Sequence, residues 1–329
     1  MGKTSEIEIF KSILGDILLG FVNEKRAFGY KYIKGARLLK QFDDYILINQ
    51  LNIRELPKDL VLNWTNKRLN ETDSTRSGRI SIVRNLAKYM TRMGYTAYLI
   101  PDKIATINRY SYIPYIFTEK EIRSIFIACD NFPVSNITPY RHIVLALIIR
   151  MLYGCGFRIS EVLNLKIDDI DLKNGVIHVR EAKFGKERII PMSNTLTTMC
   201  KQYSNTVHVT KFKDDFYFPS PYGGPYKADT IYKLYRDLLW SAGIPHSGKG
   251  PRLHDLRHTF AVHCLKRWVL NGEDLSNLLP YLTTYMGHSD LRGTEHYLKL
   301  TSDLYPSIIS GVEYYNASII PEVEIYEAN

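Results

Sequence analysis

The chain has 329 residues, of which 45% are hydrophobic, and this length and composition predict two domains with ordinary cores. No run of about 18 apolar residues is present, which excludes a membrane-spanning helix, and the first residues lack the apolar core of a signal peptide. The four cysteines form no Cys-x-x-Cys pair, which argues against a zinc site or a disulfide framework and predicts a reduced, cytoplasmic protein.

The net charge of +9 is unevenly distributed along the chain. Residues 1–104 carry 18 Lys and Arg against 11 Asp and Glu, and residues 105–300 carry an equal excess of +7. Residues 301–329 carry five acidic residues and no basic one. Two basic segments favour a protein that binds duplex DNA, because the phosphate backbone attracts cations, although many other soluble proteins are mildly basic.

The first hundred residues predict a helical domain, 1–104. Apolar residues recur at helical spacing over 7–22, 34–48, 57–69 and 75–93. Pro57 suits a first helical turn, where its missing N–H costs nothing, and Thr72 to Ser74 form a turn and cap before the last helix. Residues 94–116 contain Pro101 and Pro114 and show little periodicity, which predicts a linker at 105–116.

Residues 117–305 predict a second domain of mixed structure. Thr118 can cap a helix, with Glu121 as its capping-box partner three positions later, and residues 140–153 predict a very apolar central helix. The β-branched runs at 175–180 and 187–191 predict a hairpin that turns at 182–186. Further helices are expected at 194–203, 228–241, 254–268 and 274–286.

Two arginines of this domain are suited to chemistry on a phosphodiester. Attack on phosphorus adds negative charge to the non-bridging oxygens, and fixed cations can stabilise that charge without a metal. The planar guanidinium binds two oxygens at once and stays protonated, so Arg158 and Arg257 are candidates for such a clamp. Glu161, three residues after Arg158, could hold that arginine in place, or form only an exposed ion pair of little value.

The segment Leu253–Thr259 adds further candidates. His254 and Arg257 are three positions apart and share one face of a helix. His254 could accept a proton from a tyrosine or donate a hydrogen bond to a phosphate oxygen. Asp255 could orient a neighbouring group, and His258 is expected to pack within the helix without a catalytic role.

Tyr297 is the candidate nucleophile. A phenol can form a covalent phosphoester that retains the energy of the broken bond, so that DNA can be rejoined without ATP. Because the chain has 24 tyrosines, a tyrosine alone is no signal. Gly287-His288, with the histidine nine residues upstream, distinguishes Tyr297 from Tyr314 and Tyr315, and His288 could bind the phosphate or position the nucleophile.

The predicted hairpin turn carries candidates for a general acid. Lys183 and Lys186 could each protonate the leaving 5′-oxygen, and their spacing does not choose between them. Arg188, in the second strand, is expected to contact the DNA backbone. Lys186, Arg76 and Arg79 are also expected DNA contacts.

Six of these residues together resemble the catalytic set of the tyrosine recombinases, also called the phage integrase family. They are, in the family's order, Arg158, Lys183, His254, Arg257, His288 and Tyr297, and the similarity covers about residues 5–305. The resemblance implies that Lys183, at the first hairpin position, is the catalytic lysine. It also implies an α plus mixed α/β fold, with a helical SAM-like N-terminal core-binding domain followed by a mainly helical catalytic domain with a small antiparallel sheet.

The resemblance further implies a site-specific recombinase that needs no metal, cofactor or ATP. It would cut DNA through a 3′-phosphotyrosyl intermediate and exchange strands through a Holliday junction. The implied partners are double-stranded DNA recombination sites, a homotetramer on synapsed DNA that is monomeric or dimeric when free, and accessory DNA-bending or directionality proteins. We expect a cytoplasmic, nucleoid-associated protein of a mobile genetic element, with no membrane partner.

Three features depart from the family pattern. Cys155 stands where the family often has a small hydroxyl residue, residues 268–285 form a longer segment than usual, and no extra arm-binding domain is evident. The acidic tail, 306–329, suggests docking on a neighbouring protomer in trans through Ile319, Ile320, Val323 and Ile325, with a disordered tail as the alternative.

Three other functions compete with site-specific recombination. They are a type IB topoisomerase-like enzyme that relaxes DNA, a non-catalytic DNA-binding protein on the same fold, and a metal-dependent phosphodiesterase. The full set of six residues argues against the non-catalytic protein, and the histidines lack the carboxylate-rich cluster that a catalytic metal would need.

Overall fold

A computed structural model describes residues 10–104, 113–180, 187–247, 250–288, 290–298 and 300. The chain divides into two compact units, Met1–Tyr112 and Ile113–Asn329. Most of the predicted linker, 105–116, and the whole acidic tail lie outside the described residues.

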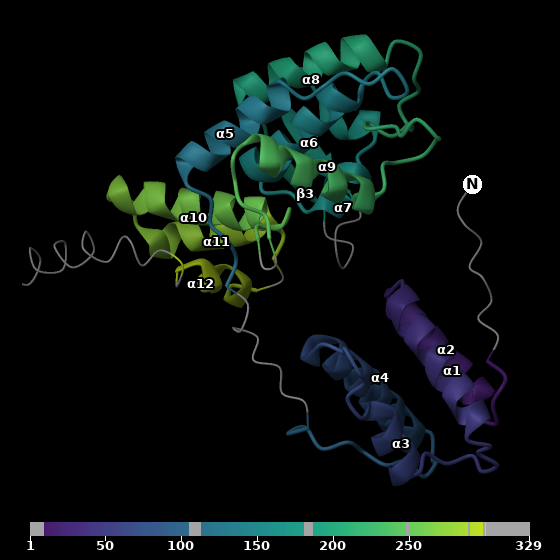
Figure 1. Cartoon of the computed structure of the whole chain (residues 1–329). Helices are drawn as coiled ribbons and strands as arrows, with labels where there is room; N and C mark the ends of the chain where they lie inside the picture. Colours follow the sequence, from purple (N-terminus) through teal and green to yellow (C-terminus); the bar gives the residue numbers. More distant parts are fainter. Residues whose placement is uncertain are drawn as a thin grey trace, which may run out of the picture. The chain divides into compact units, whose positions relative to one another are not determined.

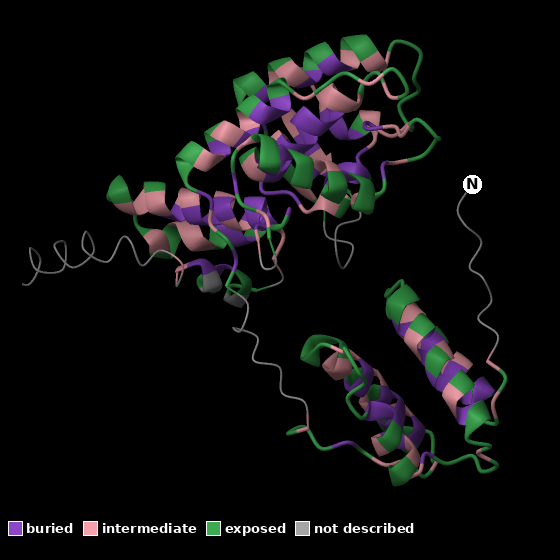
Figure 2. Ribbon diagram, viewed as in Figure 1, coloured by how far each residue is buried: buried purple, intermediate pink, exposed green. Residues whose placement is uncertain are grey.

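The described part of the first unit consists of helices (Figure 1). They are α1 (Gly15–Ala27), α2 (Ile33–Ile48), α3 (Lys58–Thr65) and α4 (Asp73–Arg92). Each helix turns one apolar face inward, and these faces form a shared core that includes Phe21, Phe42 and Leu86 (Figure 2). The side chain of Thr72 accepts a hydrogen bond from the backbone N–H of Thr75 and caps α4, as the sequence predicted.

Three helix bounds in this unit differ from the prediction by four residues or more, and one of them is the end of α1, at Ala27 where residue 22 was predicted. The first helix begins at Gly15, whereas the apolar spacing predicted a start at residue 7. The backbone N–H groups of Lys11 and Ser12 instead donate to the carboxylate of Asp43 on α2, at 2.8 and 2.9 Å. This long-range contact uses the N–H groups of residues 11 and 12, which a helix that starts at residue 7 would have bonded to its own carbonyls. Residues 7–9 lie outside the described residues. The helix α3 ends at Thr65, short of the predicted residue 69.

The second unit is mainly helical with one small sheet. Its elements are α5 (Glu119–Asp130), α6 (Arg141–Gly154), α7 (Ile159–Leu163), the 3-10 helix η1 (Ile167–Asp169), β1 (Ile170–Asp171), β2 (Val176–Val179), β3 (Arg188–Pro191), α8 (Asn194–Val207), α9 (Ala228–Ser241), α10 (Asp255–Leu270), α11 (Leu275–Met286) and α12 (Arg292–Leu298). The predicted capping box of Thr118 and Glu121 is formed at the start of α5. The predicted hairpin is also confirmed, because β2 and β3 pair antiparallel with Ile177 opposite Ile190. The two-residue strand β1 was not predicted, and it pairs antiparallel with β2.

The core of the second unit surrounds α6, whose residues from Val144 to Ile149 are all buried (Figure 2). A helix that is apolar on every face must be covered on every face, and α5, α8 and α10 pack against it. A smaller core lies between α10, α11 and α12 and includes Leu265, Met286 and Tyr297. This second core brings Gly287-His288 and Tyr297, the last two motifs of the sequence, beside the start of α10.

Candidate active site

Arg257 lies in the first turn of α10 and is only 1% exposed. Its Nη1 donates to the carbonyl of Gly156, and its Nη2 donates to the carbonyl of Met286 and to Nε2 of His288, at 3.1 Å. Burial, with the nearby charge of Arg158, lowers the pKa of Arg257 to about 10. The guanidinium therefore stays charged at neutral pH and is fixed between the start of α7 and the end of α11.

Arg158 is the residue that precedes α7, and its side chain is 24% exposed. Its backbone N–H donates to Oε2 of Glu161 at 2.9 Å, and its Nη1 donates to Oε1 at 2.8 Å. Its Nη2 donates to the carbonyl of Gly287 at 2.9 Å. Arg158 is thus anchored on one side and open to solvent on the other, which suits a cation that must meet a ligand.

Glu161 is 6% exposed, so its pairing with Arg158 is not an exposed surface ion pair. Burial alone would raise the pKa of Glu161, but hydrogen bonds and charges from Arg188 and Arg158 outweigh it and lower the pKa to about 2. The carboxylate therefore remains ionised at all physiological pH values and holds two arginines in place.

Arg188 does not occupy the DNA-facing position that the sequence predicted. Its side chain is 7% exposed, and Nη2 and Nη1 donate to the two oxygens of Glu161 at 2.8 and 3.1 Å. Its Nε donates to the carbonyl of Tyr285 at 2.9 Å. The expected DNA contact is therefore corrected: Arg188 ties β3 to α7 and to the end of α11 inside the protein.

A similar correction applies to Arg79 in the first unit. It is 1% exposed, and its guanidinium binds Glu71 and the backbone carbonyls of Trp64 and Asn66, which leaves no face for DNA. Arg76 is half-buried and donates through Nε to a backbone carbonyl. The predicted catalytic Lys183 and the DNA contact Lys186 lie outside the described residues.

His288 follows α11 and contacts Arg257 directly. Because Arg257 donates to Nε2, the imidazole proton is on Nδ1, which donates to the hydroxyl of the buried Thr294 at 2.9 Å. Burial and the charges of Arg257 and Arg158 lower the pKa of His288 to about 4, so the ring is neutral at pH 7. The preceding Gly287 has φ +64, and a Cβ there would lie 3.0 Å from Nη1 of Arg188.

Tyr297, on α12, is 3% exposed and packs into the small core beside α10. Its hydroxyl lies 3.1 Å from Nδ1 of His258. Burial raises the pKa of Tyr297, and the positive charges of Arg257 and Arg158 partly offset that rise. The structure thus brings the candidate nucleophile and the two candidate clamp residues into one electrostatic environment.

His254 and Asp255 lie at the start of α10. His254 is exposed at the rim of the site, but neighbouring atoms partly desolvate its ring, and this effect with the charges of Arg257 and Arg158 lowers its pKa. Its ring contacts the ring of His258 at 4.8 Å between centroids. The buried carboxylate of Asp255 accepts the backbone N–H of Arg252 at 2.8 Å, so it orders the chain that enters α10.

His258 is the site residue that the sequence analysis assigned to packing alone. The spacing in the sequence already places His258 among the site residues, because His254, Arg257 and His258 are at positions i, i+3 and i+4 and share one helical face. What the spacing does not contain is the position of α12, which brings Tyr297 to His258 and not to His254.

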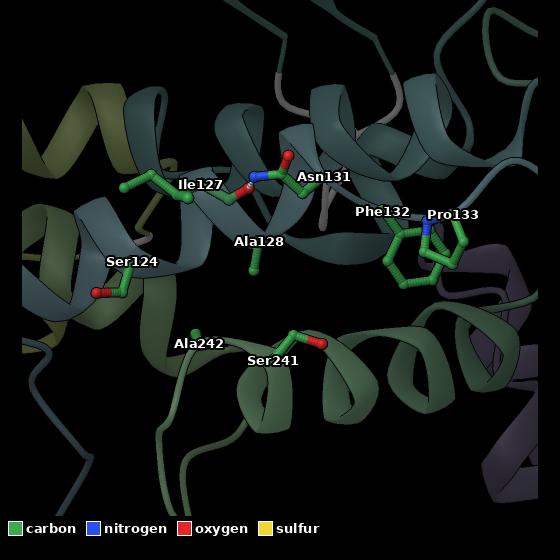
Figure 3. A pocket seen from close by; sticks show the side chains of 8 residues that line it. All are labelled: Ser124, Ile127, Ala128, Asn131, Phe132, Pro133, Ser241 and Ala242. Carbon is green, nitrogen blue, oxygen red and sulfur yellow. Dashed lines mark hydrogen bonds between the residues drawn. The ribbon is translucent and has the colours of Figure 1, made fainter.

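The described chain offers little that could form an alternative site. Within the described residues, no group of three or more His, Cys, Asp or Glu could hold a metal ion. A surface pocket of about 290 Å³ lies between α5 and α9, lined by Ser124, Ile127, Ala128, Asn131, Phe132, Pro133, Ser241 and Ala242 (Figure 3). This lining carries no charged group to recognise a phosphate.

Among the helices of the described ranges, none combines the length and the apolar character that crossing a membrane requires.

Comparison with known proteins gives a consistent result. The model of the Phage integrase family matches residues 116–303, more than half of the chain. A putative integrase/recombinase, y4rE, of Sinorhizobium fredii is 29% identical over 300 residues, which cover 90% of this chain and 94% of that protein. Tyrosine recombinase XerA of Pyrococcus horikoshii is 33% identical over 195 residues, 58% of each chain.

Two solved structures share the fold. The XerH site-specific recombinase bound to a palindromic difH substrate has a TM-score of 0.62 at 19% identity and covers 84% of this chain and 78% of its own. A lambda integrase dimer bound to a core site has a TM-score of 0.59 at 15% identity, with coverage of 86% and 94%. The predicted fold class, a helical N-terminal region with a mainly helical second domain and a small antiparallel sheet, is confirmed.

Proposed function

Because this chain belongs to the phage integrase family and is a site-specific DNA recombinase of the tyrosine recombinase type, we propose that Tyr297 attacks a DNA phosphodiester and forms a 3′-phosphotyrosyl link. The phenolic oxygen forms a bond to phosphorus, and the bond from phosphorus to the 5′-oxygen breaks. Attack of a 5′-hydroxyl from the partner strand on this link reverses the chemistry and joins the exchanged strands through a Holliday junction. Neither step consumes ATP, because one ester replaces another.

One observation carries this proposal: Arg158, Arg257, His288 and Tyr297 come from separate segments and converge on one site. Two guanidinium charges lie close enough to the tyrosine to stabilise its anion. The same charges suit the phosphorane-like transition state, where negative charge accumulates on the non-bridging oxygens. The fixed hydrogen bonds of Arg257 mean that little reorganisation is needed when that charge develops.

The remaining family positions have roles that fit their surroundings. His254, at the exposed rim and neutral because of its lowered pKa, donates a hydrogen bond to a phosphate oxygen. His288 orients Arg257, because both of its ring nitrogens are engaged by Arg257 and Thr294. Lys183, on the hairpin turn between β2 and β3, protonates the leaving 5′-oxygen. Glu161 and Asp255 hold the segments that carry these groups.

We assign the binding of a recombination site to both parts of the chain, with the helical residues 1–104 as a core-binding domain. Arg76 and Lys186 are the remaining candidates for phosphate contacts. The working assembly is four protomers on two synapsed duplexes, in the cytoplasm, with accessory DNA-bending or directionality proteins. The likeness to DNA-bound XerH and lambda integrase supports the fold that this assembly requires.

The decisive experiment captures the covalent adduct on a nicked suicide duplex made from the DNA that flanks the gene. The unaltered chain should yield a protein–DNA adduct that peptide mapping assigns to Tyr297. Tyr297→Phe should bind the duplex with unchanged affinity and form no adduct. An adduct that persists in this variant would place the nucleophile elsewhere. Relaxation of a supercoiled plasmid that lacks the flanking sequence would instead favour a topoisomerase.

A further inference from the structure

The site contains three histidines near Tyr297, and only one of them presents a nitrogen to its hydroxyl in the described part of the chain. Nδ1 of His258 lies 3.1 Å from the oxygen of Tyr297, and the two ring centroids are 5.5 Å apart. The ring of His288 stacks at 6.1 Å from Tyr297, but its nitrogens bind Arg257 and Thr294. His254 packs its ring against His258 on the preceding turn of the same helical face.

We propose that His258 is the catalytic base that accepts the hydroxyl proton of Tyr297 as the phenolic oxygen attacks phosphorus. The inference rests on the proposed role of Tyr297 and extends it. As the bond from oxygen to phosphorus forms, the proton moves to Nδ1 of His258, and the leaving 5′-oxygen takes a proton from the general acid, proposed as Lys183. When the strands are rejoined, His258 returns its proton to the phenolic oxygen as that oxygen leaves phosphorus.

The surroundings of Tyr297 explain why a base is needed. The tyrosine is 3% exposed, so bulk water has little access to its hydroxyl, and burial works against ionisation of the phenol. A neutral imidazole nitrogen has a lone pair that can accept a proton from a phenol. His258 is half-buried and the rim residue His254 is neutral, so no second imidazolium charge from that residue opposes the transfer.

The geometry also separates this role from that of the arginines. Arg257 and Arg158 stabilise an anion on Tyr297 but cannot take its proton, because a guanidinium is already fully protonated. A base and a cation therefore contribute in different ways. A more acidic phenol at position 297 depends less on a base to remove its proton. The negative charge on the phosphate needs stabilisation by cations whether the phenol is ordinary or more acidic. This difference provides the test.

The test combines His258→Asn with a fluorinated tyrosine at position 297, introduced by genetic-code expansion. The Asn amide oxygen can accept a hydrogen bond near the position of Nδ1 but cannot hold a proton. Single-turnover cleavage of the nicked suicide duplex should slow by about 10²-fold or more, the range for general base catalysis. The fluorinated phenol, which ionises more readily, should restore most of that loss in His258→Asn and none of the loss in Arg158→Ala.

The same helix supplies a matched control. His263 on α10 also places Nδ1 against a tyrosine hydroxyl, that of Tyr153, at 2.9 Å. His263→Asn should leave both the cleavage rate and its response to the fluorinated phenol unchanged. This control shows that loss of a partly buried histidine–tyrosine hydrogen bond from α10 does not by itself slow cleavage.

Two results would overturn the assignment of His258. One is cleavage by His258→Asn at the unaltered rate, and the other is a defect that the fluorinated phenol does not relieve. If His258→Asn lacks a native circular dichroism spectrum or fails to bind the duplex, His258→Gln, which better retains the side-chain volume, takes its place under the same criteria. Absence of any Tyr297 adduct in the unaltered chain would instead refute the proposed nucleophile, so the two failures are distinguishable.

Discussion

Replacing Glu161 by Gln removes one buried charge and tests the network that holds Arg158 and Arg188. The pKa of Glu161 is about 2 in the folded chain against an ordinary value of 4.5. A pKa lowered by folding stabilises the native state above the unfolded pKa, and that stability is lost as the pH falls through the folded pKa. The shift corresponds to about 3 kcal/mol at pH 7, decreasing to about 2 kcal/mol at pH 3.5.

The Gln side chain keeps the size of Glu161 but leaves the buried guanidinium of Arg188 without its counter-charge. Urea unfolding followed by circular dichroism should therefore show Glu161→Gln less stable than the unaltered chain by about 3 kcal/mol at pH 7, with a smaller difference at pH 3.5. Asp130→Asn is the matched control, because Asp130 pairs with Arg150 at 2.7 Å but is 56% exposed. It should cost less than about 1 kcal/mol. Equal stability of Glu161→Gln and the unaltered chain at pH 7, or a difference that does not change with pH, would refute the reasoning.

Three further predictions concern the reaction and its scaffold. Arg158→Ala should reduce the single-turnover cleavage rate by about 10²-fold or more while DNA binding persists, and near-normal cleavage would contradict the clamp. Lys183→Ala should slow cleavage of ordinary DNA, and a duplex with sulfur at the 5′-bridging position should restore the rate, because a thiolate leaves without protonation. Failure of that restoration would move the acid role to Lys186 or another group. Gly287→Ala should lower stability by about 1 kcal/mol or more in thermal unfolding, because its φ of +64 and its closeness to Arg188 disfavour a side chain. An unchanged midpoint would count against that conformation.

Local patterns predicted most elements of the second unit. The β-branched runs gave the hairpin, and the apolar stretch gave the central helix α6, because a short strand and a buried helix are each specified by their own side chains. The start of α1 was not predictable in this way. Its position depends on Asp43, more than 30 residues away, which binds the backbone N–H groups that a longer helix would have used.

The candidate site shows the same division between local and long-range information. The positions of Arg158, Arg257, His288 and Tyr297 could be identified from sequence, because each lies in a recognisable motif. The burial of Arg188 and Arg79 could not be predicted from the sequence, because the sequence does not distinguish an arginine that binds an internal carboxylate from one that faces DNA. The partner of Arg188 is Glu161, 27 residues earlier, and the partner of Arg79 is Glu71, eight residues earlier in the loop before α4. Neither spacing is one that a regular helix or strand would bring into contact, so both pairs form only through the fold.

The hydrogen bonds from Arg257 to the carbonyls of Gly156 and Met286 limit which mutations an inactive copy of this gene can accumulate without loss of the fold. The side chain of Arg257 connects two stretches of backbone and also supplies charge for the reaction. A mutation that removes this charge therefore removes the backbone contacts as well. Phenylalanine at position 297 would keep the ring that fills the small core and would lose only the hydroxyl, which contacts the side chain of His258. Inactive descendants of this gene that still fold should therefore have shed the phenolic oxygen while retaining the arginine.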